Sequence, residues 1–422
     1  MQTLILIVVS AALLAKVIWE GWLILLNMRE VRRRRHAPPK ALREVMDEAT
    51  YRKSVEYTLA KSRFGLFGEV YGAAVLVAVL FSGLLPWAYD LFGGGSSASV
   101  WREGLYLVAV MILLSLPGLP LDHHAQFRLE ERFGFNNSTM RLWITDKIKG
   151  VILGVVIALP LLAGILFLID WIGPWWWIWA FVLFFVFQLA MMVLYPMLIL
   201  PWFNTLTPLP EGELRQRLMA LADRTGFKAK TIQVMDGSKR SGHSNAFFTG
   251  FGRFRRIVLF DTLIEQLSEE ELEAVLAHEI GHYKLGHMPK MLALSAGFGL
   301  VSFALLAWLL QSPAFIEAFG FNHAQSGAGP AFLLFGLLAG LFTFWLSPLM
   351  NRLSRNHEYQ ADRFAREKGS GANPMIGALR KLSEKNLSNL TPHPLYSAFH
   401  YSHPTLLERE AALSGQDRGR SA

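Results

Sequence analysis

The residues best suited to chemistry lie in the run His278-Glu279-Ile280-Gly281-His282. Residues four apart share one face of a helix, so the two imidazoles can converge on a single metal ion. Glu279 points about 100° away around the helix and can reach a metal-bound water as a general base. The pattern therefore predicts a metal site of the H-E-x-x-H type. The alternative is a pair of histidines satisfied by hydrogen bonds on an ordinary helix.

A helix is expected around this motif. Ser268 and Glu271 have the spacing of a capping box, which marks a helix start. Leu272, Val275 and Leu276 give the segment an apolar face, and Gly286 is a plausible helix stop.

The third metal ligand must come from elsewhere in the chain. An H-E-x-x-H-x-x-G-x-x-H motif would need glycine at 285 and histidine at 288, where the chain has Leu285 and Met288, so His287 is out of register. The sequence contains no cysteine, which leaves a carboxylate. Glu358 and Asp362 are four apart, so Glu358 can bind the metal while Asp362 accepts a hydrogen bond from a ligating imidazole. On their spacing alone, Glu358 and Asp362 fit a solvated helix face better than a metal site.

The elements that carry these residues are those of a membrane protein. Of 422 residues, 52% are hydrophobic and only 18% are charged, and the mean hydropathy is +0.31. Soluble domains are about 25% charged. Disordered, collagen-like and low-complexity classes are excluded. Seven apolar stretches are long enough to cross a bilayer, which takes about 20 helical residues: Leu4–Leu26, Val70–Phe92, Leu105–Leu121, Val151–Ile172, Trp175–Leu200, Met291–Leu310 and Phe332–Met350.

The first stretch lacks the basic start and small-residue cleavage site of a signal peptide and is predicted to be a retained span. Lys16 and Glu20 lie one turn apart within it. Either they pair with each other or they face an aqueous interior.

The distribution of basic residues predicts the orientation. They concentrate after span one and between spans three and four: Arg29, Arg32–Arg35, Lys40, Arg43, Arg128, Arg132, Arg141, Lys147 and Lys149. The opposite loops carry only Arg102. The amino terminus is then outside, and segments 201–290 and 351–422 are cytoplasmic. The net charge of +8 reflects this bias, so no nucleic-acid partner is expected.

The chain divides into four segments. Residues 1–200 hold five predicted membrane helices with their cytoplasmic loops, and 291–350 hold helices six and seven. Residues 201–290 form a cytoplasmic α+β segment with the H-E-x-x-H motif, including a helix near Glu211–Thr225 and strands at Thr231–Met235, Ala246–Thr249 and Arg256–Phe260. Residues 351–422 are predicted to complete the metal site.

The chain resembles the integral-membrane type I CAAX prenyl endopeptidases, which are zinc metalloproteases. Five blocks carry the resemblance in the family's order: Glu130–Asn136 (EERFGFN), Ser238–Ala246 (SKRSGHSNA), His278–His282 (HEIGH), Ser354–Asp362 (SRNHEYQAD) and His400–Pro404 (HYSHP). The resemblance implies a multi-pass α-helical membrane protein in which seven helices enclose a chamber, with a cytoplasmic α+β metalloprotease domain.

The resemblance also implies roles for individual residues. His278, His282 and Glu358 would bind one zinc ion per chain, and Glu279 would be the catalytic base. Asp362 corresponds to an acid of the catalytic motif, whose role we infer to be holding a ligating histidine. Asn245 and His403 correspond to residues that contact the substrate backbone or polarise its carbonyl.

The residues themselves leave the last two roles open. His403 is a candidate donor to a developing oxyanion, although a histidine before proline is more often structural. Asn245 opens a predicted strand, to whose edge an extended peptide can add. A turn-forming asparagine fits that position equally well.

The expected function is hydrolysis of peptide bonds near the C-terminus of CAAX-type, prenylated or related peptides. The partners would be such a peptide and the lipid bilayer. The composition favours a bacterial inner membrane, and a eukaryotic chain would lie in the endoplasmic reticulum. One alternative is a zinc protease that removes damaged membrane proteins without prenyl recognition. Another is a transporter or channel with structural zinc, although no repeats with broken helices are evident and a structural zinc would not need Glu279.

Overall fold

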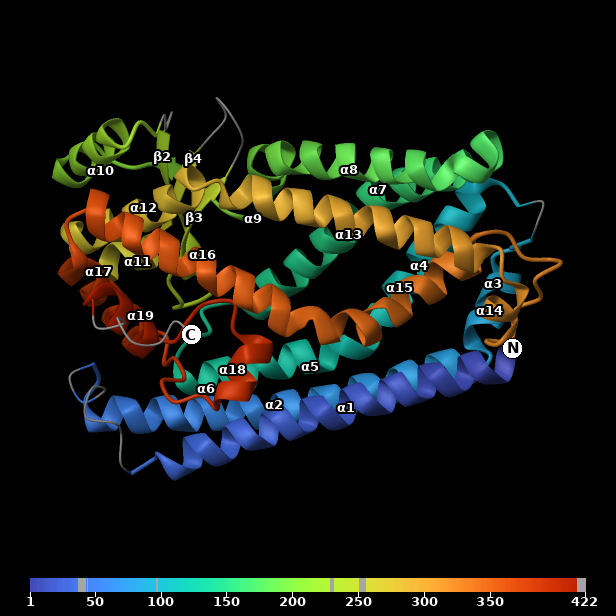
Figure 1. Cartoon of the computed structure of the whole chain (residues 1–422), viewed down its shortest axis with the longest axis horizontal. Helices are drawn as coiled ribbons and strands as arrows, with labels where there is room; N and C mark the ends of the chain where they lie inside the picture. Colours follow the sequence, from blue (N-terminus) through green and yellow to red (C-terminus); the bar gives the residue numbers. More distant parts are fainter. Residues whose placement is uncertain (37–42, 44, 96–97, 228–230, 250–255, 416–422) are drawn as a thin grey trace.

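The computed structural model describes residues 1–36, 43, 45–95, 98–227, 231–249 and 256–415. Lys40, one of the basic residues after the first predicted span, lies outside these ranges. Long helices run lengthwise through the molecule, and a small sheet with shorter helices gathers at one end (Figure 1). The amino terminus, α3 and α14 lie at the other end.

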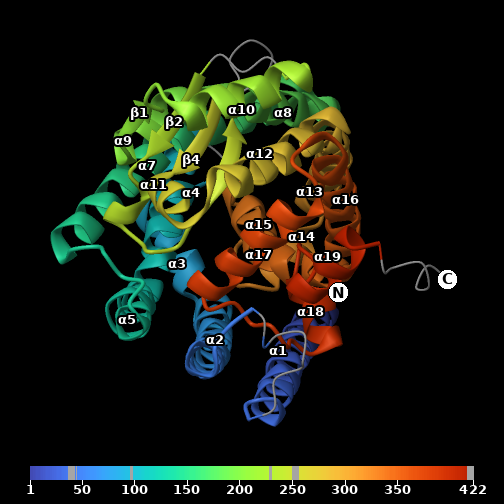
Figure 2. The ribbon, with the colours of Figure 1, turned by 90° about the vertical axis from the view of Figure 1, so that its left-hand side faces the viewer.

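The amino-terminal half is almost entirely helical. Its helices are α1 (Gln2–Arg33), α2 (Glu48–Phe81), α3 (Leu84–Leu91), α4 (Val100–Ser115), α5 (Leu119–His124), α6 (Glu131–Phe133), α7 (Met140–Ile172), α8 (Trp176–Leu194) and α9 (Leu200–Phe203). A short 3-10 turn and a π-helical segment join α4, α5 and α6 into a nearly continuous rod. The end view shows α1 and α2 as neighbouring rods along one side (Figure 2).

The carboxy-terminal half mixes strands and helices. In chain order they are β1 (Leu206–Pro208), α10 (Glu213–Arg224), β2 (Thr231–Met235), β3 (Ala246–Thr249), β4 (Arg256–Phe260), α11 (Asp261–Gln266), α12 (Glu269–Lys284), α13 (His287–Leu310), α14 (Pro313–Glu317), α15 (Gly329–Thr343), α16 (Ser347–Lys368), α17 (Ala372–Lys385), α18 (Pro394–His400) and α19 (Leu406–Leu413).

Six helical stretches in the described ranges are long and apolar enough to cross a membrane: Gln2–Arg33, Glu48–Phe81, Val100–Phe133, Met140–Phe203, His287–Leu310 and Gly329–Lys368. The multi-pass helical architecture is thus confirmed. The fourth stretch contains two of the predicted spans, α7 and α8, separated by a turn at Gly173 with φ of 71°. The count of seven therefore stays a prediction.

Lys16 and Glu20 of α1 do not form an ion pair with each other in the described structure. Lys16 pairs with Glu69 of α2. Glu20 Oε1 lies 3.4 Å from Nε2 of His400 at the end of α18. The two charged residues of the first helix therefore contact α2 and α18. Their partners lie outside the first span, so the sequence of that span could not reveal them.

The sheet has the strand order β1-β2-β4-β3. β2 and β4 are parallel, and β1 and β3 pair antiparallel with β2 and β4 respectively. The three predicted strands are confirmed, and β1 is an addition, since three residues are too few to give a periodic signal. β3 lies at an edge of the sheet, and among the described strands only β4 pairs with it.

The core beneath the sheet holds the metal-motif helix in place. Buried apolar residues of α10, β2, β4, α12 and α16 form one cluster that includes Leu218, Leu221, Ile232, Ile257, Leu276, Ile280 and Ala365. A separate cluster lies at the far end and packs α1–α4 against α14 and α15.

A buried carboxylate, Glu273, also fixes α12. It is 3% exposed and accepts hydrogen bonds from Arg217 and Arg224 of α10 and, at 2.8 Å, from the Ser370 hydroxyl. Burial by itself raises the pKa of Glu273, but these three hydrogen bonds outweigh it and hold the pKa below its usual value. Glu273 therefore stays ionised and ties α10 and the segment before α17 to the metal-motif helix.

Candidate active site

Two helices that are distant in sequence, α12 and α16, form the site. The predicted capping box is present, with the Ser268 side chain and Glu271 bonded reciprocally at the start of α12. Gly286, with φ of 68°, follows the last turn, as predicted. Gly281 lets the helices approach, because a Cβ there would lie 3.1 Å from both Ala361 Cα and Phe364 Cβ of α16. The glycine inside the H-E-x-x-H motif is thus a packing requirement.

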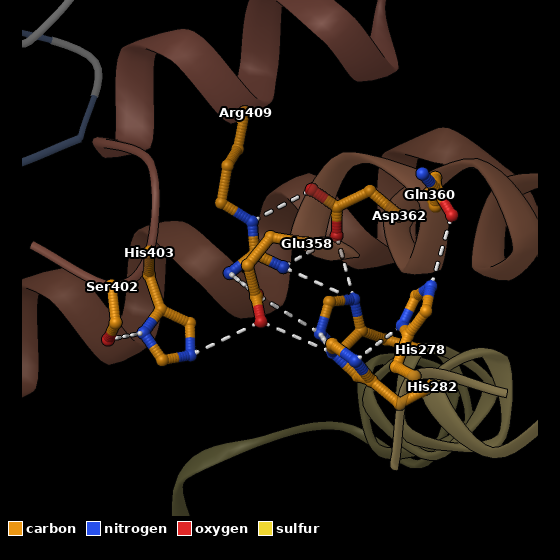
Figure 3. A network of polar contacts seen from close by, with 9 residues as sticks. His278, His282, Glu358, Gln360, Asp362, Ser402, His403 and Arg409 are labelled. Carbon is orange, nitrogen blue, oxygen red and sulfur yellow. Dashed lines mark hydrogen bonds and ion pairs between the residues drawn. The ribbon is translucent and has the colours of Figure 1, made fainter. Parts of the chain in front are cut away.

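This packing brings together His278 and His282 of α12 and Glu358 of α16, the three predicted ligands (Figure 3). Each offers an atom within 4.8 Å of the other two. The two Nε2 atoms are 3.2 Å apart. Glu358 Oε1 lies 3.2 Å from His282 Nε2, and Oε2 lies 3.4 Å from His278 Nε2.

The spacing of these three groups fits a tetrahedral zinc ion. With zinc–nitrogen and zinc–oxygen bonds of about 2.0–2.1 Å, tetrahedral ligand atoms are separated by roughly 3.3 Å. Glu358 is 4% exposed, and its Oε2 has no hydrogen-bond partner among the described residues. A buried carboxylate oxygen is costly unless a cation neutralises it. Arg409 Nη1 lies 3.8 Å from Oε2, too far for a hydrogen bond, which leaves Oε2 able to bind a closer cation. The residues present therefore fit zinc.

Asp362 holds His278 in the orientation that a metal ligand needs. Its Oδ1 lies 2.8 Å from His278 Nδ1, on the ring side away from Glu358. The proton is thus on Nδ1, and Nε2 keeps its lone pair for the metal. Burial by itself lowers the pKa of His278, but Asp362 and Glu358 raise it to about 9. The two carboxylates make this position favourable for positive charge.

Arg409 is a site residue that the sequence did not reveal. It lies on α19, is 8% exposed, and donates Nε–H and Nη2–H to the two oxygens of Asp362, at 2.8 and 2.5 Å. Its Nη2 is also 3.4 Å from His278 Nδ1. Two hydrogen bonds from one guanidinium to both oxygens fix the orientation of a carboxylate. An arginine on a short amphipathic helix has no local signal of this role.

His287 supports His282, the second predicted ligand, in a similar way. Its Nδ1 lies 3.0 Å from Nδ1 of His282, and its Nε2 lies 3.1 Å from the Gln360 amide oxygen. An amide oxygen only accepts, so His287 carries its proton on Nε2 and accepts from His282 through Nδ1. His282 then presents its Nε2 to the metal. The motif spacing bears on His287 only as a possible ligand, whereas the structure places it as the hydrogen-bond partner of His282.

Glu279 is outside the cluster of the three predicted ligands. Burial raises its pKa, partly opposed by the nearby His278 and His282. A raised carboxylate pKa suits a group that takes up and returns a proton near neutral pH.

His403 lies beside the ligands. Its Nε2 is 3.4 Å from Glu358 Oε1, and its Nδ1 is 2.9 Å from the Ser402 hydroxyl. The side chain is 64% exposed, so it faces space in which a substrate can lie. Figure 3 shows it across Glu358 from the two histidines.

Asn245 directly precedes β3, and β3 contacts α12. Its side-chain oxygen accepts a hydrogen bond from the Ala246 N–H at 2.8 Å. Among the described residues it has no hydrogen bond to the ligands or to His403, so the structure places it at the sheet edge without joining it to the cluster.

The segment before Asn245 is braced by another of the sequence blocks. Asn136 and Ser241 form an antiparallel bridge, and Gly242 N–H donates to the Phe135 carbonyl at 3.0 Å. The Phe135 ring stacks on His243 with centroids 4.1 Å apart. The EERFGFN block therefore supports the start of the edge strand.

Comparison with known proteins covers nearly all of the chain. Residues 27–205 match the family model described as CAAX prenyl protease N-terminal, five membrane helices, and residues 208–417 match Peptidase family M48. The chain is 39% identical to CAAX prenyl protease 1 of Saccharomyces cerevisiae, covering 89% of this chain and 88% of that protein. It is 32% identical to the human homologue, covering 94% and 92%. A crystal structure of S. mikatae Ste24p superposes with a TM-score of 0.89 at 34% identity, covering 96% and 98%.

Proposed function

Because the chain belongs to peptidase family M48 and to its CAAX prenyl protease branch, it is an integral-membrane metalloprotease, and we propose that it uses one zinc ion held by His278, His282 and Glu358 to cleave peptides near their C-terminus. The observation that carries the zinc assignment is the convergence of the three side chains. The two histidine Nε2 atoms are 3.2 Å apart, and each lies 3.2–3.4 Å from one oxygen of the buried Glu358 carboxylate. Glu358 Oε2 has no hydrogen-bond partner among the described residues. We propose prenylated CAAX-type peptides as the substrate class.

The roles of the chain's own groups follow from their positions. Zinc bound to the three ligands would supply a Lewis acid for the scissile carbonyl and lower the pKa of a water molecule to about 7. Glu279 accepts the proton of the attacking water and passes it to the leaving amine. His403 donates a hydrogen bond to the carbonyl oxygen as it gains negative charge. Asn245 and the outer edge of β3 bind the extended peptide backbone. Asp362 and Arg409 keep His278 oriented.

Four segments divide this work. Residues 1–200 and 291–350 form the membrane part, 201–290 carry β3 and the H-E-x-x-H helix, and 351–422 supply Glu358, Asp362 and His403. The change of matching family model between residues 205 and 208 supports the first boundary. One hydrophobic cluster joins buried residues of 201–290 to Ala365 and Ala378, which supports a shared metalloprotease part distinct from the membrane part.

Activity should be lost with a zinc chelator and return on adding zinc. The direct experiment uses purified protein and matched peptides with and without farnesyl, with products identified by mass spectrometry. Each buried CH₂ contributes about 0.8 kcal/mol, so binding of the lipid should raise kcat/KM at least about tenfold. Cleavage that resists chelation would contradict the metalloprotease assignment. Equal cleavage of both peptides would contradict prenyl recognition and favour a protease for damaged membrane proteins.

We propose that the active site faces the cytoplasm, on a bacterial inner membrane or, in a eukaryote, on the endoplasmic reticulum. The basic residues after span one and between spans three and four support this side.

A cysteine at Ala324, an exposed residue between α14 and α15, should react with a membrane-impermeant maleimide in intact bacteria that express the protein in their inner membrane. A cysteine at Ala220, exposed on α10, should react only after permeabilisation. The chain has no other cysteine, so each label reports one site. Labelling of the Ala220 position in intact cells would place the metal site on the outside.

A further inference from the structure

A pocket of about 550 Å³ lies between α1, α2 and the segments that flank the active site. Its walls include Glu20 and Asn27 of α1, Lys61 of α2, His243, Asn386 and Tyr401. A second pocket, which His403 lines, shares Ser388, Asn389 and Tyr401 as walls with the first. The larger pocket is therefore next to the His403 side of the metal cluster.

The charged groups around this pocket differ in the ion pairs and hydrogen bonds that they form. Glu69 forms an ion pair with Lys16. Glu20 Oε1 lies 3.4 Å from His400 Nε2, but Glu20 Oε2 has no hydrogen-bond partner among the described residues. Lys61 likewise has no carboxylate oxygen within 4.0 Å in the part of the chain that the structure describes, and its one hydrogen bond there is to the Tyr57 hydroxyl at 3.3 Å. An ammonium group has three N–H donors, so Lys61 has donors left for an anionic ligand.

A network of hydrogen bonds fixes the side chains around Lys61. The Tyr57 hydroxyl lies 2.8 and 2.9 Å from the Glu130 oxygens and donates to that carboxylate. Glu130 Oε2 is 3.5 Å from His243 Nε2, and His243 Nδ1 is 3.1 Å from the Asn386 side-chain oxygen. The network joins α2, the EERFGFN block, the segment before β3 and the end of α17. It is built around the pocket, and none of its members binds the metal.

The edge strand β3 connects the predicted metal site with the pocket that Lys61 lines. A peptide that pairs antiparallel with β3 has its C-terminal end directed toward the residues that precede Ala246. Those residues are Asn245, Ser244 and His243, and His243 lines the pocket. Extended chain advances about 3.4 Å per residue. His243 precedes Ala246 by three residues, so if the cleaved bond lies opposite the start of β3, a tail of two or three residues beyond it ends near His243.

We propose that this pocket binds the free C-terminal carboxylate of the substrate, with Lys61 as its cationic partner. The inference rests on the proposed function and deepens it: the preferred substrates are peptides cut a few residues from a free C-terminus, and the carboxylate sets the position of the cut. Lys61 is a specificity residue for a group that does not react.

The test compares two peptides of the same sequence, one ending in a free carboxylate and one in a carboxamide. The wild-type protein should cleave the carboxylate peptide with a kcat/KM about tenfold or more higher, as expected for a charge-assisted hydrogen bond. Lys61→Met should remove that preference by lowering kcat/KM for the carboxylate peptide alone, mainly through KM. Lys61→Arg should retain most of it. Lys53→Met is the matched control, since Lys53 is exposed on the same helix two turns away and lines neither pocket.

The same comparison can be made without turnover. The short C-terminal product should bind the inactive Glu279→Gln protein more tightly as the acid than as the amide, and Lys61→Met should abolish the difference. Equal cleavage of the two peptides by the wild type would overturn the carboxylate site. An equal loss on both peptides in Lys61→Met would show a structural role for Lys61. If the zinc-loaded wild type cleaved neither peptide, the proposed function itself would be contradicted.

Discussion

Replacing Glu279 with glutamine is expected to lower turnover about 10²–10⁴-fold, the usual effect of losing a general base. Glutamine keeps the shape of the side chain but cannot accept the proton of the attacking water. Glu279 is not one of the three clustered ligands, so zinc should stay near one per chain. Turnover is measured with a peptide substrate, and zinc by elemental analysis of the same purified protein.

Glu270→Gln provides the control for Glu279→Gln. It makes the same chemical change on the same helix, at a side chain that is 63% exposed and 3.7 Å from Arg217. It should keep wild-type turnover. A Glu279→Gln protein that still turned over substantially would show that another group activates the water. One that lost its zinc would make Glu279 a ligand.

The pair Glu358→Gln and Asp362→Asn should separate a metal ligand from the residue that positions one. Glu358→Gln removes the anionic ligand from a buried site. It should lower zinc affinity more than a substitution of a residue that only positions a ligand. Activity should be lost at low zinc concentration. Asp362→Asn leaves the three ligands in place but weakens the hold on His278, which typically costs roughly 10–100-fold in metal affinity or activity.

Zinc affinity is measured by competition with a chelator of known affinity. Because Asp362 also pairs with the buried Arg409, breaking that pair destabilises the fold, so thermal unfolding must first show that the variant is folded. Full zinc in Glu358→Gln with none in Asp362→Asn would reverse the two assignments.

The sequence by itself determined the features that depend on neighbours along the chain. The capping box at Ser268, the shared face of His278 and His282, and the three longer strands all follow from local spacing. The apolar stretches predicted the membrane helices for the same reason. The third ligand was suggested by spacing, but the choice of Glu358 over a solvated helix face came from the resemblance of several blocks together.

Only the tertiary structure decided which distant residues meet. Arg409 lies 131 positions from His278, and no periodicity links a residue on α19 to one on α12. Lys16 and Glu20 have separate partners on α2 and α18, because their side chains face different helices of the bundle. His287 is five residues from His282, yet its role depends on Gln360 of α16. A hydrogen-bond partner is chosen by position in space, and helix packing sets that position only once the whole chain has folded.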